Sequence, residues 1–171
     1  MEFILRKWNY DDVESLAVAA NNKNIANKLR NIFPYPYTVE DAKTYVSQCI
    51  RRDGERCILR AIEIDGKAAG SIGLFLQNDV YEKSAELGYW LSEEYWGKGV
   101  MTRAVEEICK EGFDKFDIVR IYAEPFENNV GSRKVLEKAG FVYEGTMRNG
   151  VCKNGEVFSY CVYSVLRGEI Q

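Results

Sequence analysis

Residues 84–126 restrict the possible folds more than any other part of this chain. SAELGYWLS at 84–92 has the pattern of a strand, EYWGKG follows as a glycine-bearing loop, and an amphipathic helix begins at residue 100. IVRIYAEPF at 118–126 is predicted to be another strand. A strand–helix–strand unit implies two parallel strands joined by a right-handed crossover. In sheets of this kind, ligands bind beyond the carboxyl ends of the parallel strands.

The first half of the chain supplies helices and a hairpin. Residues 2–8 are predicted to form a strand, and a helix begins at Asp11 or Asp12 and runs through Ala20. The remaining elements expected before residue 84 are a short helix over 24–31, a helix that Thr38 caps with Asp41 and that ends near Arg52, and strands 57–64 and 67–77 around an Asp65-Gly66 turn.

The last third is predicted to end in antiparallel strands. Asn129 can cap a helix through Ala139, and Gly140 stands where a helix end favours positive φ. Residues 141–166 are expected to form two strands, with turns at Asn149-Gly150 and Asn154-Gly155. No linker or repeat interrupts the chain, so one domain over 1–171 is expected. Its parallel unit and flanking hairpins predict an α/β fold of the α+β type with a mixed sheet.

Composition excludes several classes of function. The chain has 171 residues and a formal net charge of −3, which does not favour nucleic acid as a partner. It has no stretch of roughly 18 apolar residues, so no membrane span is expected. The acidic, aromatic start MEFILRKWNYDD is unlike a signal peptide, and a cytoplasmic location is therefore expected.

The cysteine and histidine content limits the chemistry further. Five widely spaced cysteines include no Cys-x-x-Cys pair, so zinc and disulfides are not expected, and all five are predicted to be buried small hydrophobes. The chain has no histidine, which rules out histidine-based triads and histidine metal sites. A general base must then be a carboxylate, a perturbed Lys, Tyr or Cys, or a relayed water.

The loop Trp96-Gly97-Lys98-Gly99 is the strongest candidate for a binding site. Glycine lets the backbone approach a ligand closely, and a helix start offers unpaired N–H groups that suit phosphate. A lone Gly-x-Gly is compatible with a simple tight turn. Its place between a strand and a helix favours diphosphate binding. The loop lacks the Gly-Lys-Ser/Thr ending of a nucleotide P-loop and the third glycine of a dinucleotide fingerprint.

Two longer motifs resemble a known family. ELGYWLSEEYWGKGVMTRAV, followed by NNVGSRKVLEKAGFVYEG, resembles the GNAT superfamily of acetyltransferases, and within it the RimJ/RimL branch that acetylates ribosomal-protein N-termini. FPYPYTVEDAKTYV and GEVFSYCVYSVLRGE are similar to the same branch. The resemblance implies a mixed, strongly twisted central sheet of about seven strands with helices on both faces. It also implies transfer of an acetyl group from acetyl-CoA to a primary amine, without a metal.

The resemblance assigns cofactor contacts residue by residue. Gly99 matches the central glycine of the pyrophosphate loop, whereas Trp96 stands where Gln or Arg is usual and Met101 where Gly or Ala is usual. A backbone cradle survives both departures. The residues so implied in the cradle are Gly97, Lys98, Gly99, Val100, Met101 and Thr102; the backbones of Leu91 and Ser92 and the side chain of Asn129 are assigned to the pantetheine arm. Arg103 and Arg133 are candidates for phosphate contacts or for a solvated surface.

The chemistry is expected to be direct attack of the amine on the thioester. Glu86 is the first candidate base, because a carboxylate inside a central strand is costly unless it is paired or functional. Strand alternation places Glu86, Gly88 and Trp90 on one face. Glu124 or a water relay is the alternative base, and a structural hydrogen bond is the alternative role for Glu86. A backbone N–H near Trp90–Leu91 is the candidate oxyanion donor.

Help for the leaving thiolate is expected from Ser132. Many members of the family use a tyrosine in the helix after the asparagine, and Leu136 occupies that position here. Ser132 resembles the serine that this branch places near the coenzyme sulfur. Its alternative role is a hydrogen bond to its own helix turn.

The acceptor is the least determined part of the prediction. Phe33, Tyr35 and Tyr37 lie where the resemblance places the acceptor groove, although core packing is an equal alternative, and Trp90 is also assigned to substrate binding. The leading acceptor is the N-terminal α-amine of a protein; a polyamine, amino acid or antibiotic amine, or a non-catalytic acyl-CoA-binding module, remains open. An acidic groove would favour a polyamine and a peptide-wide groove a protein terminus. Because dimers are common in such families, a homodimer is also compatible with the sequence.

Overall fold

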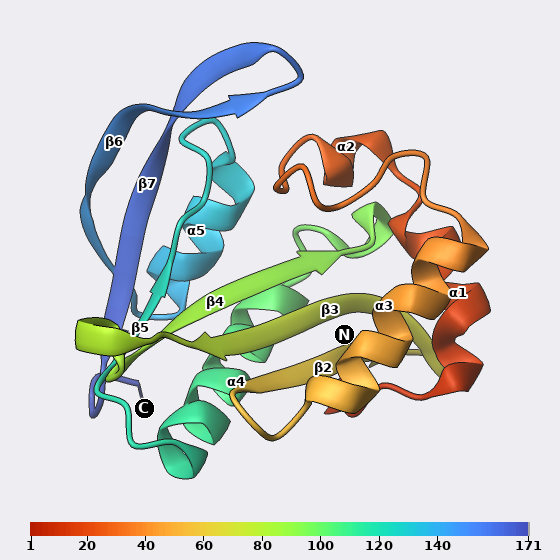
Figure 1. The fold of residues 1–171 in the computed structure, drawn as a ribbon, viewed down its shortest axis with the longest axis horizontal. Helices are drawn as coiled ribbons and strands as arrows, with labels where there is room; N and C mark the ends of the chain where they lie inside the picture. Colours follow the sequence, from red (N-terminus) through yellow and green to blue (C-terminus); the bar gives the residue numbers. More distant parts are fainter. Residues whose placement is uncertain (171) are drawn as a thin grey trace. The chain divides into compact units, whose positions relative to one another are not determined.

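The computed structural model describes residues 1–170, which form α-helices, short 3-10 helices and β-strands (Figure 1). The helices are α1 (Val13–Ala20), α2 (Lys23–Ala26), α3 (Val39–Arg52), α4 (Val100–Lys115) and α5 (Val130–Lys138). The strands are β1 (Ile4–Arg6), β2 (Cys57–Ile64), β3 (Lys67–Leu76), β4 (Ser84–Leu91), β5 (Arg120–Ala123), β6 (Val142–Lys153) and β7 (Glu156–Leu166). Short 3-10 helices lie at Tyr10–Asp12, Asp79–Tyr81 and Glu93–Tyr95.

The seven strands form one sheet in the order β1-β2-β3-β4-β5-β7-β6. β4 and β5 are parallel, with Glu86 opposite Tyr122, and α4 lies between them in the chain. β1 is antiparallel to β2, and β7 is antiparallel to both β5 and β6. The predicted mixed α/β sheet with a parallel pair around a crossover helix is therefore confirmed.

The chain is organised as two compact units whose segments alternate in sequence. Unit 1 contains Met1–Gly73 and Tyr89–Val100, and unit 2 contains Leu74–Gly88 and residues 101–170. The expectation of a single domain over 1–171 stays a prediction.

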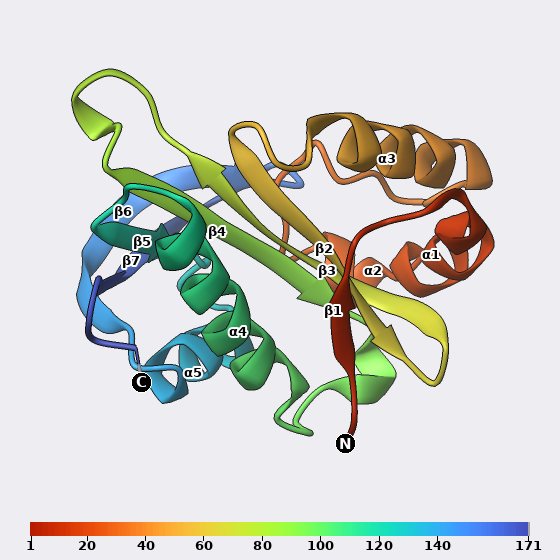
Figure 2. The ribbon, with the colours of Figure 1, turned by 90° about the horizontal axis from the view of Figure 1, so that it is seen from below.

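In unit 1, α3 packs beside α1, as two views at right angles show (Figures 1 and 2). Thr38 begins α3 through a reciprocal capping box: its hydroxyl accepts from the Asp41 backbone N–H at 3.1 Å, and its own backbone N–H donates to the Asp41 carboxylate at 2.8 Å. Tyr45 fastens α3 to β3 through a 2.7 Å hydrogen bond between its hydroxyl and that of Ser71. The Thr38 cap predicted from sequence is confirmed.

In unit 2, β6 and β7 form a long hairpin that twists strongly along its length (Figure 1). Asn154 and Gly155 make its turn with φ of 54° and 77°, as predicted. The apolar face of α4 is buried, with Ala104, Val105 and Ile108 fully inaccessible to solvent, in agreement with the predicted amphipathic pattern. Helix α5 follows β5 and precedes β6, and contacts β6.

The structure corrects two predictions. Asn149-Gly150 is a bulge within β6 and not a turn: pairing with β7 resumes at Val151, and residues 148–150 lie opposite Ser159 alone. The Asn149 N–H donates to the Ser159 hydroxyl at 3.0 Å, so the inserted residues stay attached to β7. The prediction that all five cysteines are buried is wrong for Cys152, which is exposed on β6, while the other four are buried.

Several boundaries also differ from those expected. The first helix begins at Val13, one or two residues after its predicted start at Asp11 or Asp12, because Asn9 and Asp12 form a capping box over a 3-10 turn at Tyr10–Asp12. The helix expected over 24–31 is the shorter α2, and β5 ends at Ala123. Beyond β5, Pro125 has no N–H to donate to a ladder, but its carbonyl accepts from Cys161 at 2.8 Å.

Candidate functional site

The loop between β4 and α4 contains two glycines at positive φ directly before a long helix. Gly97 and Gly99 have φ of 73° and 76°, values that a residue with a side chain adopts only with strain. A Cβ placed on either glycine would have no atom within 4 Å, so this backbone faces open space. Val100 begins the 16-residue helix α4 directly after Gly99. The N–H groups of the first helical turn lack intrahelical partners and therefore suit a diphosphate.

The burial of side chains at the start of α4 indicates that a ligand here would contact the backbone. Val100 and Met101 are buried, so their side chains belong to the core, and only their main-chain groups are available to a ligand. Lys98 is exposed and its ammonium lies 5.5 Å from the centre of the Tyr95 ring. The unusual Met101 therefore does not interrupt a cradle built from N–H groups. The contacts predicted for residues 97–102 nevertheless stay predictions.

The carboxyl end of β4 is held by neighbours on both sides in unit 1. The Ser92 N–H donates to the Ala69 carbonyl at 2.8 Å, and the Trp96 indole Nε1–H donates to the Leu91 carbonyl at 2.7 Å. A Cβ on Gly70 would lie 2.5 Å from the Trp90 carbonyl oxygen, so β3 and β4 approach very closely here. The Ser92 N–H already has a partner in β3. Of the two residues predicted to bind the pantetheine arm through their backbones, Leu91 is therefore the better candidate donor.

Three of the four aromatic residues predicted to face the acceptor lie together in unit 1. The Phe33 ring is 5.1 Å from that of Tyr37 and 5.8 Å from that of Trp90, measured between centroids. Tyr37 and Trp90 are buried, and burial raises the pKa of the Tyr37 phenol. Tyr35 is 52% exposed and has no ring contact with this group. Phe33, Tyr37 and Trp90 thus form one aromatic cluster, while Tyr35 points to solvent.

Helix α2 is connected to the segment after β4, a link that sequence analysis missed. The Nδ2 groups of Asn22 and Asn24 donate to the Glu93 carboxylate at 2.7 and 3.0 Å, and these bonds hold the pKa of Glu93 below its usual value. The Lys28 ammonium lies 4.5 Å from the centre of the Trp96 ring. These residues are about 70 positions apart in sequence, and no local pattern identifies such pairs.

Glu86 lies in unit 2, in the part of β4 that pairs with β5. Its neighbours Ala85 and Leu87 are buried, whereas Glu86 is half-buried and stands opposite Tyr122 in the ladder. Burial alternates from Ala85 to Gly88, as predicted, but the pattern does not continue through Leu91, because Trp90 and Leu91 are both buried. Glu124 is also half-buried and follows β5 by one residue. Both carboxylates remain candidates for the base.

Asn129 is the N-cap of α5. Its Oδ1 accepts from the Ser132 N–H at 3.2 Å, and its backbone carbonyl accepts from the Arg133 N–H at 3.1 Å. The cap predicted at this position is confirmed. The cap uses one lone pair of Oδ1, and the contact predicted between Asn129 and pantetheine stays a prediction. Leu136, at the position where a tyrosine is usual, is fully buried, and Ser132 is half-buried in the first turn.

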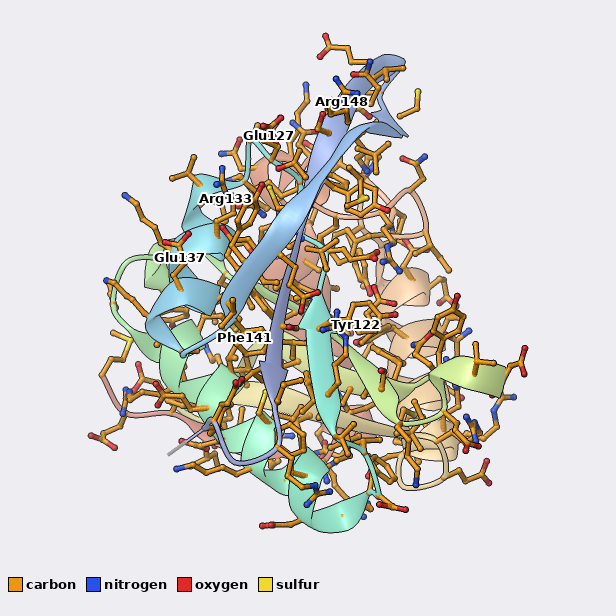
Figure 3. The ribbon with its side chains drawn as sticks, turned by 90° about the vertical axis from the view of Figure 1, so that its left-hand side faces the viewer. Tyr122, Glu127, Arg133, Glu137, Phe141 and Arg148 are labelled. Atoms are coloured by element: carbon orange, nitrogen blue, oxygen red, sulfur yellow. The ribbon has the colours of Figure 1, made fainter. Side chains whose placement is uncertain are left out.

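A buried tyrosine on β7 is hydrogen-bonded to Arg133 and Glu137 of α5 in unit 2, two residues that Figure 3 labels. The Arg133 Nε–H donates to the Tyr163 hydroxyl at 3.2 Å, and that hydroxyl donates to the Glu137 carboxylate at 2.9 Å. A second Arg133 nitrogen donates to the Glu127 carbonyl at 3.2 Å. Arg133 therefore has a structural role at the start of α5, and its predicted phosphate contact stays a prediction. Sequence analysis missed Tyr163, because nothing in its local pattern distinguishes it from other strand tyrosines.

Neither a metal-binding cluster nor a membrane-spanning helix is found in the described part of the chain. Among residues 1–170, no group of three or more Cys, Asp or Glu side chains is arranged to hold a metal ion. Over the same residues, no helix is long and apolar enough to cross a membrane.

Comparisons with known proteins agree with this geometry. The family model described as "Acetyltransferase (GNAT) domain" matches residues 2–142. YdaF of Bacillus subtilis (strain 168), provisionally named a ribosomal N-acetyltransferase, is 35% identical over 105 residues, which cover 61% of this chain and 57% of YdaF. Spermidine N(1)-acetyltransferase of Escherichia coli (strain K12) is 30% identical over 154 residues, or 89% of this chain and 79% of that protein.

A solved structure shows the same fold at low sequence identity. RimL, a ribosomal L7/L12 α-N-protein acetyltransferase solved with coenzyme A, superposes with a TM-score of 0.84 and is 20% identical. The match covers 96% of this chain and 93% of RimL. At this identity the similarity extends to the fold alone.

Proposed function

Because the chain belongs to the GNAT family of acetyl-CoA-dependent N-acetyltransferases, we propose that it acetylates the N-terminal α-amine of a protein or peptide. The observation that supports acetyl-CoA binding is the geometry of the loop at the start of α4. Gly97 and Gly99 are both at positive φ and both face open space. A diphosphate placed there would meet backbone N–H groups and the positive end of a long helix dipole.

The charge of the segment between α1 and α3 supports a peptide acceptor over a polyamine. Residues 21–38 include Lys23, Lys28 and Arg30 and no acidic residue. The nearby Glu93 is occupied by two asparagine side chains. A polyamine carries several positive charges and would be repelled by such a segment. The 30% identity to a spermidine acetyltransferase keeps the polyamine as the second candidate.

The proposed reaction is direct displacement at the thioester. The amine nitrogen attacks the acetyl carbonyl carbon, the carbon–sulfur bond breaks, and the coenzyme leaves as a thiolate. Glu86 takes the proton that the attacking amine loses, directly or through water. The Leu91 N–H stabilises the developing oxyanion, and the Ser132 hydroxyl donates to the departing sulfur. Leu136, which occupies the position where a tyrosine is usual, has no acidic group that could protonate the departing thiolate.

The proposal is tested by thiol release from acetyl-CoA with a panel of peptides and small amines. A peptide with a free α-amine is expected to be acetylated in preference to spermidine. Glu86→Gln and Ser132→Ala are each expected to lower kcat by ~100-fold, the lower end for one acid–base group. If both variants keep the wild-type rate, the catalytic assignment is wrong. Intact acetyl-CoA binding without turnover on any amine would instead support a non-catalytic acyl-CoA-binding module.

A matched pair of glycine variants isolates the cofactor loop. Gly99 and Gly66 both belong to unit 1 and have φ of 76° and 75°, and a Cβ added to either would have no atom within 4 Å. Gly99→Glu and Gly66→Glu therefore carry similar backbone strain, but only the first places a carboxylate in the proposed cradle. Gly99→Glu is expected to abolish measurable acetyl-CoA binding, and Gly66→Glu to preserve it. Equal affinities in the two variants would refute the assignment of the loop.

A further inference from the structure

We propose that Trp96 is a positioning residue for the cofactor: its indole N–H orients the Leu91 carbonyl at the end of β4 so that this carbonyl can accept a hydrogen bond from the pantetheine arm. The inference rests on the proposed function, since it presumes that Leu91 contacts acetyl-CoA. The inference gives a role to the Trp96 side chain, which stands where the family usually has Gln or Arg.

The hydrogen bond is short and well placed. Nε1 of Trp96 lies 2.7 Å from the Leu91 carbonyl oxygen, at the short end of the range for N–H···O bonds. Leu91 is 5% exposed, so this carbonyl has little access to water, and Trp96 is 37% exposed, so its ring also borders solvent. A buried carbonyl without a partner would be costly, which makes the indole donor important to this strand end.

The bond leaves the Leu91 carbonyl able to take a second partner. A carbonyl oxygen has two lone pairs, and the indole uses one of them. The adjacent Ser92 N–H is bonded to Ala69, and the Trp90 carbonyl lies against Gly70. With its neighbours fixed on both sides, the Leu91 carbonyl can present its remaining lone pair in only a narrow range of directions. An amide N–H of pantetheine is the complementary donor.

Trp96 also links this strand end to helix α2. The Lys28 ammonium is 4.5 Å from the centre of the indole ring, within the range of a cation–π contact. Glu93, three residues earlier, accepts from Asn22 and Asn24 at the start of α2. The indole therefore has two separable functions: its N–H serves Leu91, and its π face serves Lys28.

These two functions can be separated by substitution. Trp96→Phe keeps an aromatic face for Lys28 and removes the donor. Trp96→Gln removes the ring and keeps a side-chain N–H that can reach a carbonyl. Lys28→Met is the matched control, because it removes the cation–π contact and leaves the indole N–H in place.

The readout is affinity for acetyl-CoA compared with 3′-phosphoadenosine 5′-diphosphate, a fragment without pantetheine, by calorimetry. Trp96→Phe is expected to raise the Kd of acetyl-CoA about fivefold, the value of one neutral hydrogen bond, and to change that of the fragment less than ~2-fold. Trp96→Gln is expected to restore most of the acetyl-CoA affinity. Lys28→Met is expected to leave both affinities unchanged.

Several results would overturn the inference. Wild-type acetyl-CoA affinity in Trp96→Phe would do so, and so would an equal loss of affinity for the fragment or a loss in Lys28→Met that matches Trp96→Phe. If Trp96→Phe does not fold, replacement of Trp96 by benzothienylalanine, which has the shape of tryptophan without its N–H, provides the same comparison. In all these cases the wild-type protein binds acetyl-CoA. Failure of the wild-type protein to bind it would instead refute the proposed function.

Discussion

Gly70→Ala is expected to damage the end of β4 through one added methyl group. The new Cβ would lie 2.5 Å from the Trp90 carbonyl oxygen and 3.1 Å from the Leu91 Cα. A carbon and an oxygen that are not bonded normally stay more than about 3 Å apart, and both clashing atoms belong to the backbone of the neighbouring strand. The strands must separate, because no rotamer change can relieve the contact.

The expected loss of stability can be estimated from the effect of adding methyl groups to well-packed protein cores. Extra methyl groups in a well-packed interior destabilise by ~1–3 kcal/mol, and a clash with backbone belongs at the upper end of that range. We therefore expect Gly70→Ala to lower the free energy of unfolding in urea by about 2–3 kcal/mol. Acetyl-CoA affinity is expected to fall as well, because the same movement displaces the proposed Leu91 contact.

Gly112→Ala in α4 is the matched control. A Cβ at Gly112 would lie even closer to a neighbour, 2.3 Å from Leu74 Cδ1, but that atom is the end of a flexible side chain. Leu74 can change rotamer, and alanine is favoured over glycine inside a helix by about 1 kcal/mol. The net change at Gly112 is expected to stay within about 1 kcal/mol. If Gly112→Ala proves more destabilising than Gly70→Ala, the reasoning from backbone contact is wrong.

Two further predictions concern helix starts. Asn129→Ala removes the side-chain acceptor for the Ser132 N–H and is expected to cost about 1 kcal/mol in urea unfolding, whereas Asn129→Asp, which keeps an acceptor, should cost much less. The Asp41 carboxylate accepts hydrogen bonds from the Thr38 N–H and hydroxyl, and these bonds lower the pKa of Asp41 in the folded state. Its contribution to the free energy of unfolding is therefore complete above the unfolded pKa of about 3.9 and is lost as the pH falls through the folded pKa. The stability difference between wild type and Asp41→Asn should therefore be constant near neutral pH and shrink as the pH falls below the unfolded pKa of about 3.9, and an unchanged difference would contradict this assignment.

Local sequence determined much of the fold because the interactions that specify it span only a few residues. The Thr38 capping box, the Asn154-Gly155 turn and the glycine loop before α4 each depend on neighbouring backbone groups. The absence of histidine likewise limited the chemistry without any structure. The same local logic failed at Asn149-Gly150, where pairing with β7 on both sides turned a predicted turn into a bulge.

The candidate site depended more on tertiary structure. The motifs and the family resemblance identified the residues from Trp90 to Thr102, and they identified Asn129 and Ser132. They could not show that the Leu91 carbonyl is held by Trp96, that Lys28 lies over that indole, or that Gly70 is pressed against the Trp90 carbonyl. The contacts of Gly70 and Lys28 join segments about 20 and about 70 residues apart, and the bond between Trp96 and Leu91, five residues apart, depends on how the chain turns after β4. Hydrophobic period and turn chemistry carry no information about which distant side chains meet, so the folded chain alone decides them.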